Sequence, residues 1–489
     1  MNIVWITSES VPFAKTGGLA DVSGSLPAAL GERGNSVSVI MPCYTGIFRQ
    51  KAVTFDSRVD LFGVPFGGRT QWASVRIKKT APNVTYYFIE CDRYFDRATL
   101  YDYQGAEYGD NAERFLFFSR AAMECVKVLK LPADILHCND WHCALCTVYL
   151  RSDLYRNDPA FAACRSVLTI HNIGYQGNFD KSNMHWTGLG WEYFNYQCLE
   201  YYDRINLLKA GIACADQVNT VSRNYAQEIL TEEYSFGLEG VLRHRSSEGK
   251  LRGILNGIDV KEWDPSSDPL LPARFSAKDL KGKALCKKAL QKHFNLPCRK
   301  EVPLLGVLSR LAFQKGLDVF VRALEGMLSV DDFQFVVIGS GERFLEDQLH
   351  SLAGKYPEKM GFHCGYAPDK IAHLLEGGCD FFVMPSRYEP CGLNQMYSMR
   401  CGTLPVVRFT GGLADTVHNL DLKDPTHSTG FVFRDLTEDA LRNTVRWASS
   451  IYKERPEIIR EMRICAMKQD FSWDRTASLY EQMYHDAHQ

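Results

Sequence analysis

The six residues TGGLAD occur twice in this chain, at Thr16–Asp21 and at Thr410–Asp415. A Gly-Gly pair lets backbone amides approach an anion closely, and a helix that begins there directs the positive end of its dipole at the same place. Lys15 precedes the first copy, and a lysine near a helix N-terminus indicates an anionic partner. The alternatives are an ordinary turn between a strand and a helix, and a lysine that is simply solvated.

Two further cations and a carboxylate occur in the second half of the chain, each just after an apolar, strand-like run. Arg310 and Lys315 lie in SRLAFQKG, and Glu389 lies in PSRYEPCGLNQ. Together with Lys15, the two cations could stabilise a departing diphosphate without a metal ion, while Glu389 could accept hydrogen bonds from sugar hydroxyls. The alternatives are a solvated loop for the cations and a favourable helix-dipole interaction for the carboxylate.

The segment HCNDWHCALC, residues 137–146, has the residue types of a metal site. A strand-to-helix boundary is expected inside it, so its His and Cys side chains should diverge, and no second Cys pair stands at zinc-ribbon spacing. We therefore expect no metal here and interpret Asp140, Trp141 and His142 as a sugar-binding lip. His171 and Asn172 follow the apolar run SVLTI, where a functional and a structural role for the histidine are equally compatible with the pattern.

Short apolar runs alternate with helical patterns along the whole chain. This alternation is typical of parallel sheets covered by helices on both faces, an α/β class in which ligands bind beyond the carboxyl ends of the strands. Pro, Ser and Asp accumulate at residues 251–272, which predicts a domain joint there. We predict two doubly wound, Rossmann-like domains, 1–252 and 253–470, followed by an amphipathic helix within 471–489.

Length and composition favour two domains and exclude several classes of protein. The 489 residues exceed what one hydrophobic core usually supports, and 45% hydrophobic with 23% charged residues is ordinary for a globular protein. A net charge of -2 gives no basis for binding nucleic acid or a membrane surface. Because neither a signal peptide nor a long apolar span is visible, we expect a cytoplasmic protein with 16 reduced cysteines, or a plastid protein whose transit peptide has been removed.

The order of seven motifs resembles that of the bacterial glycogen synthases and plant starch synthases, glycosyltransferase family 5: KTGGLADV, NDWH, HNIGYQG, NGID, SRLAFQKGLD, PSRYEPCGLNQ and TGGLADTV. The resemblance covers essentially the whole chain. It implies a GT-B fold, in which two Rossmann-like domains face a central cleft, with the acceptor glucan on the N-terminal side and the nucleotide sugar on the C-terminal side. It also implies that the final helix packs back on the N-terminal domain.

The resemblance implies a retaining hexosyltransferase, a glycogen or starch synthase that moves glucose from ADP-glucose to the non-reducing end of an α-1,4-glucan and releases ADP. It implies no metal and no other cofactor. Its catalytic residues would be Glu389, Arg310, Lys315 and His171. Donor contacts would come from Lys15, Gly18, Asp21, Asp140, Asn256, Tyr366, Cys391, Gly392, Leu393 and Asn394. Acceptor contacts would come from Glu9, Trp141, His142 and Asn172.

One position departs from many retaining enzymes of this fold, because the residue eight positions after Glu389 is Tyr397 rather than a second glutamate. Members of family 5 commonly share this departure. It leaves no obvious pair of carboxylates for a double displacement, so it favours same-face attack in which the departing phosphate takes the acceptor's proton.

Two other functions are weighed against a synthase. A nucleotide-dependent oxidoreductase is disfavoured because no G-x-G-x-x-G follows the first strand, and a catalytically silent glucan-binding scaffold is disfavoured because the charged residues of the motifs are all present. The motifs distinguish neither glycogen from starch as the product, nor a strict from a relaxed preference for ADP- over UDP-glucose, nor one oligomeric state from another.

Overall fold

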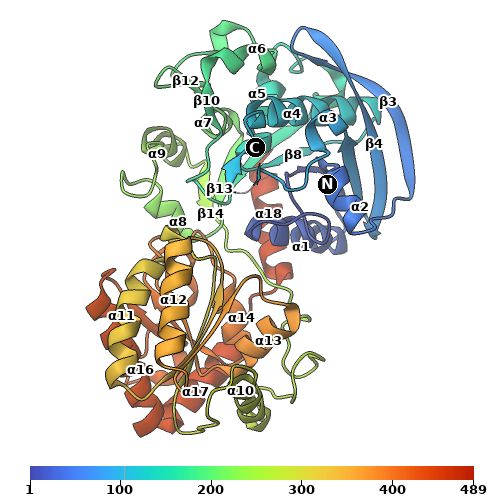
Figure 1. The fold of residues 1–489 in the computed structure, drawn as a ribbon. Coiled ribbons are helices and arrows are strands. Elements are labelled where there is room, and N and C mark those ends of the chain that lie inside the picture. Colours follow the sequence, from blue (N-terminus) through green and yellow to red (C-terminus); the bar gives the residue numbers. More distant parts are fainter. Residues whose placement is uncertain (104) are drawn as a thin grey trace. The chain divides into compact units, whose positions relative to one another are not determined.

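The computed structural model describes residues 1–103 and 105–489. The chain divides into two compact units, one formed by Met1–Gly257 together with Trp473–Gln489 and one formed by Ile258–Ser472 (Figure 1). Each unit is built on its own sheet with helices packed against it, so the predicted α/β class is confirmed.

The main sheet of the first unit has nine strands among the described residues, in the order β14-β13-β9-β8-β1-β2-β5-β4-β3. The strands from β14 to β5 run parallel, and β4 and β3 are antiparallel to their neighbours. In that order the strands are Leu251–Gly253, Gln217–Thr220, Arg165–Ile170, Ile135–Asn139, Asn2–Ile6, Ser36–Pro42, Val84–Glu90, Arg69–Ala81 and Ser57–Phe66. The central strands β1, β8 and β9 are mostly apolar and are buried after their first residue or throughout, as expected for a sheet covered on both faces.

The antiparallel edge of this sheet was absent from the sequence-based expectations. β3 and β4 are joined by a two-residue turn, Gly67–Gly68, with φ of 59° and 74°. One of the two favoured hairpin turns of this length, type I′, has positive φ at both central residues, which glycine adopts without strain. The Gly-Gly pair was therefore a hairpin signal in the sequence.

Helices cover both faces of the first sheet (Figure 1). α4, α5 and α7 pack side by side on one face, and α1 packs with the C-terminal helix α18 on the other. The helices of this unit are α1 Gly18–Glu32, α2 Thr45–Gln50, α3 Asp92–Phe95, α4 Asn111–Val128, α5 Trp141–Arg151, α6 Met184–Thr187, α7 Leu207–Cys214, α8 Arg223–Glu228, α9 Glu239–Ser247 and α18 Trp473–Ala487. A small sheet, β10-β12-β11, spans Asn178–Asp180, Arg204–Asn206 and Glu200–Tyr201, and a short pair, β6-β7, spans Asp102–Tyr103 and Ala106–Glu107.

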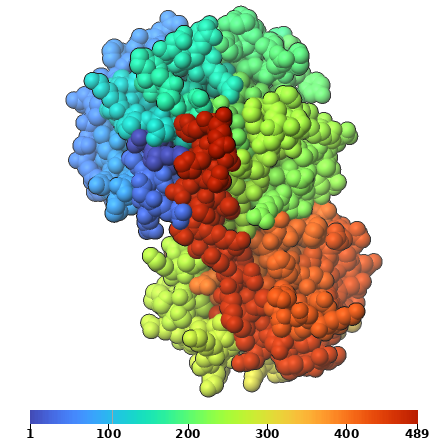
Figure 2. Space-filling view, turned by 180° about the vertical axis from the view of Figure 1, so that it is seen from behind, coloured from blue at the N-terminus to red at the C-terminus, as the bar shows by residue number. Residues whose placement is uncertain are grey.

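α18 is part of the first unit although it follows the second unit in the chain. Arg33, just after α1, forms ion pairs with Asp474 at 2.7 Å and with Glu481 at 2.8 Å. On the buried side of the helix, the Tyr484 hydroxyl lies 2.7 Å from Nδ1 of His137 in β8. Figure 2 shows the red C-terminal residues lying beside the blue N-terminal ones on this face.

The second unit has a sheet of six strands, counted over the residues that the structure describes, and every pairing in it is parallel. In the order β17-β16-β15-β18-β19-β20 the strands are Met360–Cys364, Gln334–Gly339, Leu304–Leu308, Phe381–Met384, Leu404–Arg408 and Phe431–Phe433. Its helices are α10 Lys281–His293, α11 Leu317–Val330, α12 Arg343–Lys355, α13 Asp369–Gly378, α14 Asn394–Arg400, α15 Gly411–Thr416, α16 Glu438–Glu454 and α17 Pro456–Met467.

In both units the order of the strands reverses at one place, between β1 and β8 in the first sheet and between β15 and β18 in the second. On either side of such a reversal the connecting helices go to opposite faces, which leaves a crevice at the carboxyl ends of the two central strands. The loops that follow these strands are therefore where each unit is built to bind a ligand.

Candidate active site

The strand reversal of the first unit carries most of the predicted residues of that unit. Glu9–Asp21 follow β1, Asp140–His142 follow β8, and His171 and Asn172 follow β9. Because β9, β8 and β1 are adjacent and parallel, all three loops leave the same edge of the sheet. The motifs KTGGL, NDWH and HNIGYQG are thus neighbours in space.

Glu9 holds the first TGGLAD loop in place. Its carboxylate accepts hydrogen bonds from the backbone N–H of Thr16 at 2.5 Å, from the Thr16 hydroxyl at 2.9 Å and from the N–H of Gly17 at 3.3 Å. Burial raises the pKa of the Glu9 carboxyl, and the hydrogen bonds from Thr16, Gly17 and Tyr101 lower it. The residue is 4% exposed, so what the structure shows it doing is shaping the loop before α1.

The first turn of α1 faces open space beside a cation. A Cβ atom added at Gly17 or Gly18 would meet no atom within 4 Å. The Lys15 ammonium lies 2.6 Å from Oδ1 of Asp21, and the lysine side chain is 40% exposed. Burial raises the pKa of Asp21, while the Lys15 charge lowers it. Backbone amides at the start of a 15-residue helix, with an ammonium at hand, can hold an anion.

Asp140 stands directly before α5 in a conformation that is rare for any residue but glycine, with φ of 57° and ψ of −175°. Such backbone strain costs about 1–3 kcal/mol and persists at functional sites. Its Oδ1 accepts a hydrogen bond from the backbone N–H of His171 at 2.7 Å. Burial raises the pKa of the carboxyl to about 7, although the amides of His171 and Asn172 lower it. Asp140 therefore ties the loops after β8 and β9 together.

The side chain of His171 is oriented by Asn139, which the sequence analysis did not single out. The Asn139 amide group donates to the carbonyl of Ile6 at 3.0 Å, so its oxygen faces Nε2 of His171 at 2.9 Å. Since that oxygen can only accept, the neutral imidazole carries its proton on Nε2 and keeps Nδ1 as an acceptor. Burial lowers the pKa of His171 to about 3, which keeps the ring neutral at physiological pH.

Trp141 and His142, the expected sugar-binding lip, are mostly buried and their rings stack on each other. The two rings stack with centroids 4.0 Å apart, and the ring of Tyr101 also stacks on His142, with centroids 4.7 Å apart. Gly177 is required here, because its φ is 61° and a Cβ would lie 2.5 Å from the tryptophan ring. Asn172 is half-buried, and its side-chain oxygen accepts from the N–H of Gly174 at 3.0 Å.

Five buried polar side-chain atoms of this unit lack hydrogen-bond partners within the described part of the chain, and two of the five are Nδ1 of His142 and Oδ1 of Asn256. Both residues belong to the predicted site. An unpaired buried polar atom costs about 1–3 kcal/mol, so native proteins keep few of them and those few call for an explanation. A polar ligand that completes the missing hydrogen bonds is such an explanation.

The second unit brings Lys315 and Glu389 together at its own strand reversal. Lys315 follows β15 and Glu389 follows β18, and the ammonium lies 2.9 and 2.8 Å from the two carboxylate oxygens. The Ser386 hydroxyl donates to the same carboxylate at 2.8 Å. Glu389 is 5% exposed, so this is a buried carboxylate held on two sides with a cation at its mouth. The Lys315 side chain, 21% exposed, links it to solvent.

Arg310 is exposed and forms no side-chain hydrogen bond or ion pair with any residue that the structure describes. Arg310 follows the same strand as Lys315, β15, and stands six residues before the turn at Gly316. That glycine has φ of 65°, and a Cβ there would lie 2.0 Å from the carbonyl of Pro385 in the loop after β18. The close approach locks the two loops of the reversal together and leaves the Arg310 guanidinium available for an anion.

Residues Cys391–Asn394 connect Glu389 to α14. Cys391 is buried, Gly392 has φ of 72°, and Leu393 is the residue before the helix. The Asn394 amide group donates to the carbonyl of Leu308 at the end of β15, at 2.8 Å. This bond joins the second predicted loop of the unit to the first.

Two tyrosines of the second unit lie apart from this pair. Tyr366 is 80% exposed in the loop after β17, two strands from the reversal. Tyr397, where many related folds have a second glutamate, stacks on Trp263 with ring centroids 4.1 Å apart, and Trp263 stacks on His373 at 4.0 Å. The Tyr397 ring is thus a packing element.

The residue types that resembled a metal site diverge in the structure. His137 turns to Tyr484 and Thr169, whereas the Cys143 thiol donates to the carbonyl of Ile6. Over the described residues, no three His, Cys, Asp or Glu side chains gather where they could hold a metal ion. In the same part of the chain, no helix is long and apolar enough to cross a membrane.

Sequence reasoning missed Asn139 and Ser386. Each directly positions a predicted residue, and each lay inside a quoted motif, HCNDWH and PSRYEP. Only their closeness in sequence to predicted site residues could have indicated them. An Asn or Ser beside a charged or aromatic residue has no spacing that distinguishes it from a turn residue.

Comparisons with known proteins fit this geometry. The family model of the starch synthase catalytic domain matches residues 2–244, and that of the group 1 glycosyl transferases matches residues 290–463. A glycogen synthase of Anaeromyxobacter sp. (strain Fw109-5) is 45% identical over 487 residues, which is 99% of both chains. Glycogen synthase 1 of Geobacter sulfurreducens is 44% identical over 488 residues, 99% of this chain and 96% of that one.

Among solved structures, the catalytic domain of starch synthase IV from Arabidopsis thaliana, bound to ADP and acarbose, matches with a TM-score of 0.89 and 32% identity, over 100% of this chain and 99% of that one. Identity of this extent over the whole length, joined to the same fold, settles the relationship. The chain belongs to the glycogen and starch synthase family, hexosyltransferases of GT-B fold.

Proposed function

We propose that this chain transfers glucose from ADP-glucose to the non-reducing end of an α-1,4-glucan, with retention of the anomeric configuration and release of ADP. The observation that carries the proposal is the Lys315–Glu389 pair at the strand reversal, with the exposed Arg310 in the same loop as Lys315. A buried carboxylate suits the hydroxyls of a sugar, and two cations beside it suit the diphosphate from which that sugar departs.

On the donor side, Arg310 and Lys315 stabilise the charge that develops on the diphosphate, and Glu389 holds the glucosyl hydroxyls. The backbone of Cys391–Asn394 borders the same place, and the exposed ring of Tyr366 is free to stack on adenine. Lys15, Gly18 and Asp21 are also proposed donor contacts, because α1 begins in open space beside an ammonium. The ADP in the starch synthase IV structure supports this choice of nucleotide.

The transferred glucose is held by buried polar groups of the first unit. Asp140 and Asn256 offer buried oxygen atoms, and His171 offers Nδ1 as an acceptor for a sugar hydroxyl. Trp141, His142 and Asn172 are proposed acceptor contacts. Glu9 serves the acceptor chiefly by fixing the loop before α1, since its hydrogen bonds are already made inside the protein.

Retention follows from attack on the face that the diphosphate leaves. The bond between the anomeric carbon and the phosphate oxygen breaks, the bond to the acceptor hydroxyl oxygen forms, and the hydroxyl proton passes to the departing phosphate. The cations stabilise that phosphate, so no side chain forms a covalent intermediate. Tyr397 supports this course because its ring is stacked in the protein where a second carboxylate would stand. Isolation of a glucosyl ester on any side chain would contradict it.

The same reasoning proposes that the reaction needs no metal ion, because Lys15, Arg310 and Lys315 supply the positive charge. The bacterial relatives further suggest that it takes place in the cytoplasm. The balanced net charge of -2 supports neutral glucan and a small nucleotide sugar, rather than nucleic acid or a membrane, as partners.

The test is transfer of radiolabelled glucose from ADP-, UDP- and GDP-glucose onto glycogen, with and without EDTA. We expect ADP-glucose to be the best donor and EDTA to have no effect. E389Q should lower kcat by roughly 100- to 1000-fold, the loss typical of one removed transition-state contact. The matched control is E358Q, which changes an exposed glutamate of the same unit. Equal activity of E389Q and E358Q would remove Glu389 from the site.

A further inference from the structure

The loop between β15 and α11, residues 309–316, carries both cations of the second unit that are proposed to meet the departing diphosphate, Arg310 and Lys315. This cation loop must be held in place, because a displacement of about 1 Å in a catalytic group can cost about 100-fold in rate. Its first part is tied to the neighbouring strand, since the N–H of Leu311 donates to the carbonyl of Ser340, after β16, at 2.8 Å. Its last part is tied by a side chain from the loop after β18.

That side chain belongs to Arg387, two residues before Glu389. Nη1 of its guanidinium donates to the carbonyl of Phe313 at 2.7 Å and to Oδ1 of Asp318 at 2.6 Å, and Nη2 donates to Oδ2 of the same carboxylate at 2.8 Å. Asp318 lies in the first turn of α11. Two parallel N–H···O bonds to one carboxylate fix orientation as well as position. Arg387 thus bridges the cation loop and the helix that follows it.

The backbone around this contact is also constrained. The N–H of Arg387 donates to the carbonyl of Gln314 at 2.9 Å, and the N–H of Phe313 donates to Oε1 of Glu342 at 2.8 Å. Both polar groups of the Phe313 backbone are therefore used, the N–H by Glu342 and the carbonyl by Arg387. Lys315 is only two residues further on, so the position of its ammonium depends on how firmly Phe313 is held.

The guanidinium of Arg387 is occupied within the protein. Its carbon lies 3.5 Å from the centre of the Phe313 ring, so the ring covers one of its faces. The Arg387 side chain is 21% exposed and that of Asp318 is 24% exposed. Arg387 is therefore placed to act on the cation loop, whereas the exposed Arg310 is placed to act on a ligand.

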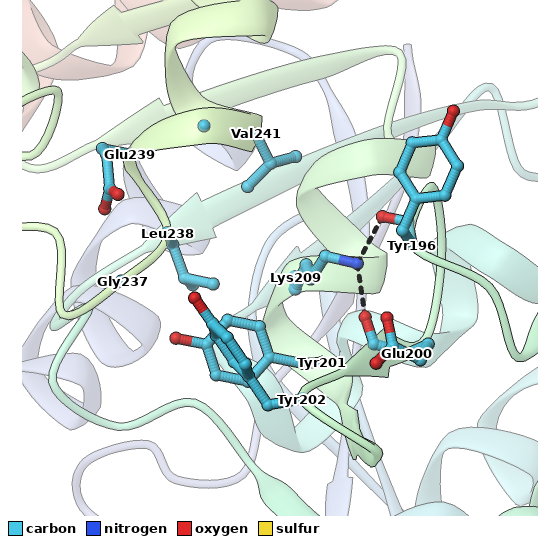
Figure 3. A pocket seen from close by; sticks show the side chains of 10 residues that line it. Tyr196, Glu200, Tyr201, Tyr202, Lys209, Gly237, Leu238, Glu239 and Val241 are labelled. Atoms are coloured by element: carbon cyan, nitrogen blue, oxygen red, sulfur yellow. Dashed lines mark hydrogen bonds between the residues drawn. The ribbon is translucent and has the colours of Figure 1, made fainter.

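The first unit contains a comparable cation outside its proposed site. The Lys209 ammonium donates to the backbone carbonyls of Tyr196 at 2.6 Å, Cys198 at 3.2 Å and Glu200 at 2.6 Å, beside a pocket of about 330 Å³, and Figure 3 draws two of these bonds. An ammonium has three hydrogens, so all of them are used on the protein. Lys209 fixes a loop that carries no residue of the proposed site, whereas Arg387 fixes one that carries two.

We propose that Arg387 is a positioning residue for the reaction. By holding the cation loop, it fixes where the charges of Arg310 and Lys315 lie. The inference rests on the proposed function, because the position of these charges matters when a diphosphate departs. Negative charge on the diphosphate grows as its bond to glucose breaks, so misplaced cations weaken the transition state more than the bound donor. Arg387 therefore acts on kcat rather than on KM.

The test is R387K, assayed with ADP-glucose and glycogen. Lysine keeps the charge but cannot form the two parallel bonds to Asp318. We expect kcat to fall about 10- to 100-fold, while KM for ADP-glucose and KM for glycogen each change less than about threefold. The matched control is R322K, because Arg322 lies 3.6 Å from the same carboxylate, pairs with Glu438 at 2.7 Å and is 53% exposed. R322K should have the kcat of the wild type.

A double variant separates positioning from a general loss of folded enzyme. If Arg387 acts through Lys315, the losses of kcat in R387K and K315M should not multiply in R387K/K315M. A loss of folded enzyme would instead lower kcat by the same factor with and without K315M. Fully multiplied losses would therefore overturn the inference, and so would an R387K enzyme as active as R322K.

Hydrogen exchange reads the cation loop without any substrate. In R387K the amides of residues 311–317 should exchange about tenfold faster, as expected when a charged hydrogen bond is lost, whereas those of β16 should be unchanged. Unchanged exchange at 311–317 would also overturn the inference. Failure of the proposed function looks different, because the wild type would then transfer no glucose, while exchange still shows whether Arg387 holds the loop.

Discussion

The two copies of TGGLAD have the same sequence and opposite surroundings. In the first, the space around Gly17 and Gly18 is open, and the loop is held from the side by the Glu9 carboxylate. In the second, a Cβ at Gly411 would lie 1.9 Å from the carbonyl of Glu389, and one at Gly412 would lie 2.0 Å from that of Cys391.

The residue that precedes each copy is likewise open to solvent in the first unit and packed in the second. Lys15 precedes the first copy and is exposed next to Asp21, whereas Phe409 precedes the second and lies under the Arg434 guanidinium, 4.3 Å from its ring centre. In the first copy, glycine would let a ligand approach the backbone closely. In the second copy, glycine is needed because the backbone that carries Glu389 lies too close for a side chain. The same six-residue sequence is open to approach in the first unit and closely packed against neighbouring backbone in the second.

The largest effect should come from adding a methyl group to the packed copy. G412A drives a Cβ into a backbone carbonyl, so the free energy of unfolding of the second unit should fall by roughly 3–5 kcal/mol. The matched variant G18A should leave it within about 0.5 kcal/mol, because nothing lies within 4 Å. Calorimetry on both variants measures this. Equal costs at the two positions would break the comparison.

A smaller effect is expected from Asp140, which shares the sheet edge of the open copy. Its pKa is about 7 when folded and ordinarily 3.8, so the native state binds the extra proton and loses stability as pH rises from about 4 to 7. D140N lacks this penalty and keeps an oxygen for the His171 amide. Above pH 7 it should be more stable than the wild type by up to about 4 kcal/mol, and near pH 4 equally stable. Urea unfolding across this range decides it, and a constant difference would contradict the buried charge.

Replacement of Asn139, the residue before Asp140, tests how the side chain of His171 is oriented. N139D places a carboxylate against Nε2 of His171, which should raise the pKa of that imidazole from about 3 by about one to two units. NMR titration of labelled histidine reads both the pKa and the protonated nitrogen. His137, bonded to Thr169 and Tyr484, is the internal control. A wild-type ring protonated on Nδ1 would refute the assigned orientation.

The smallest stability effect belongs to the exposed Lys15–Asp21 pair. An ion pair of this kind is worth less than about 1 kcal/mol, so K15M should barely change the melting temperature. If the open copy binds the donor, K15M should nevertheless weaken ADP binding by about tenfold in calorimetric titration. F409M, the equivalent change at the packed copy, should leave ADP affinity unaltered. Identical ADP affinities for both variants would show that the two copies do not differ in function.

The sequence could predict that the site residues lie at the carboxyl ends of the strands in each sheet. Lys315 and Glu389 each follow an apolar strand, and parallel strands end on one edge, so two residues 74 positions apart meet at 2.8 Å. The hairpin at Gly67–Gly68 could also have been predicted from its Gly-Gly pair. The alternation of strands and helices predicted parallel strands only. The tautomer of His171 and the packing of Gly412 depend on atoms distant in the chain, which no local pattern encodes.

The placement of α18 has a consequence for how the molecule is made. Residues Ile258–Ser472 are contiguous, so the second unit can fold as soon as its own last residue has left the ribosome. The first unit, synthesised earlier, must wait for Tyr480 and Tyr484 to reach the polar groups of Asn219 and His137. The unit that is synthesised first is thus the last to be completed, and a chain released before α18 is made would contain a folded second unit and an incomplete first unit.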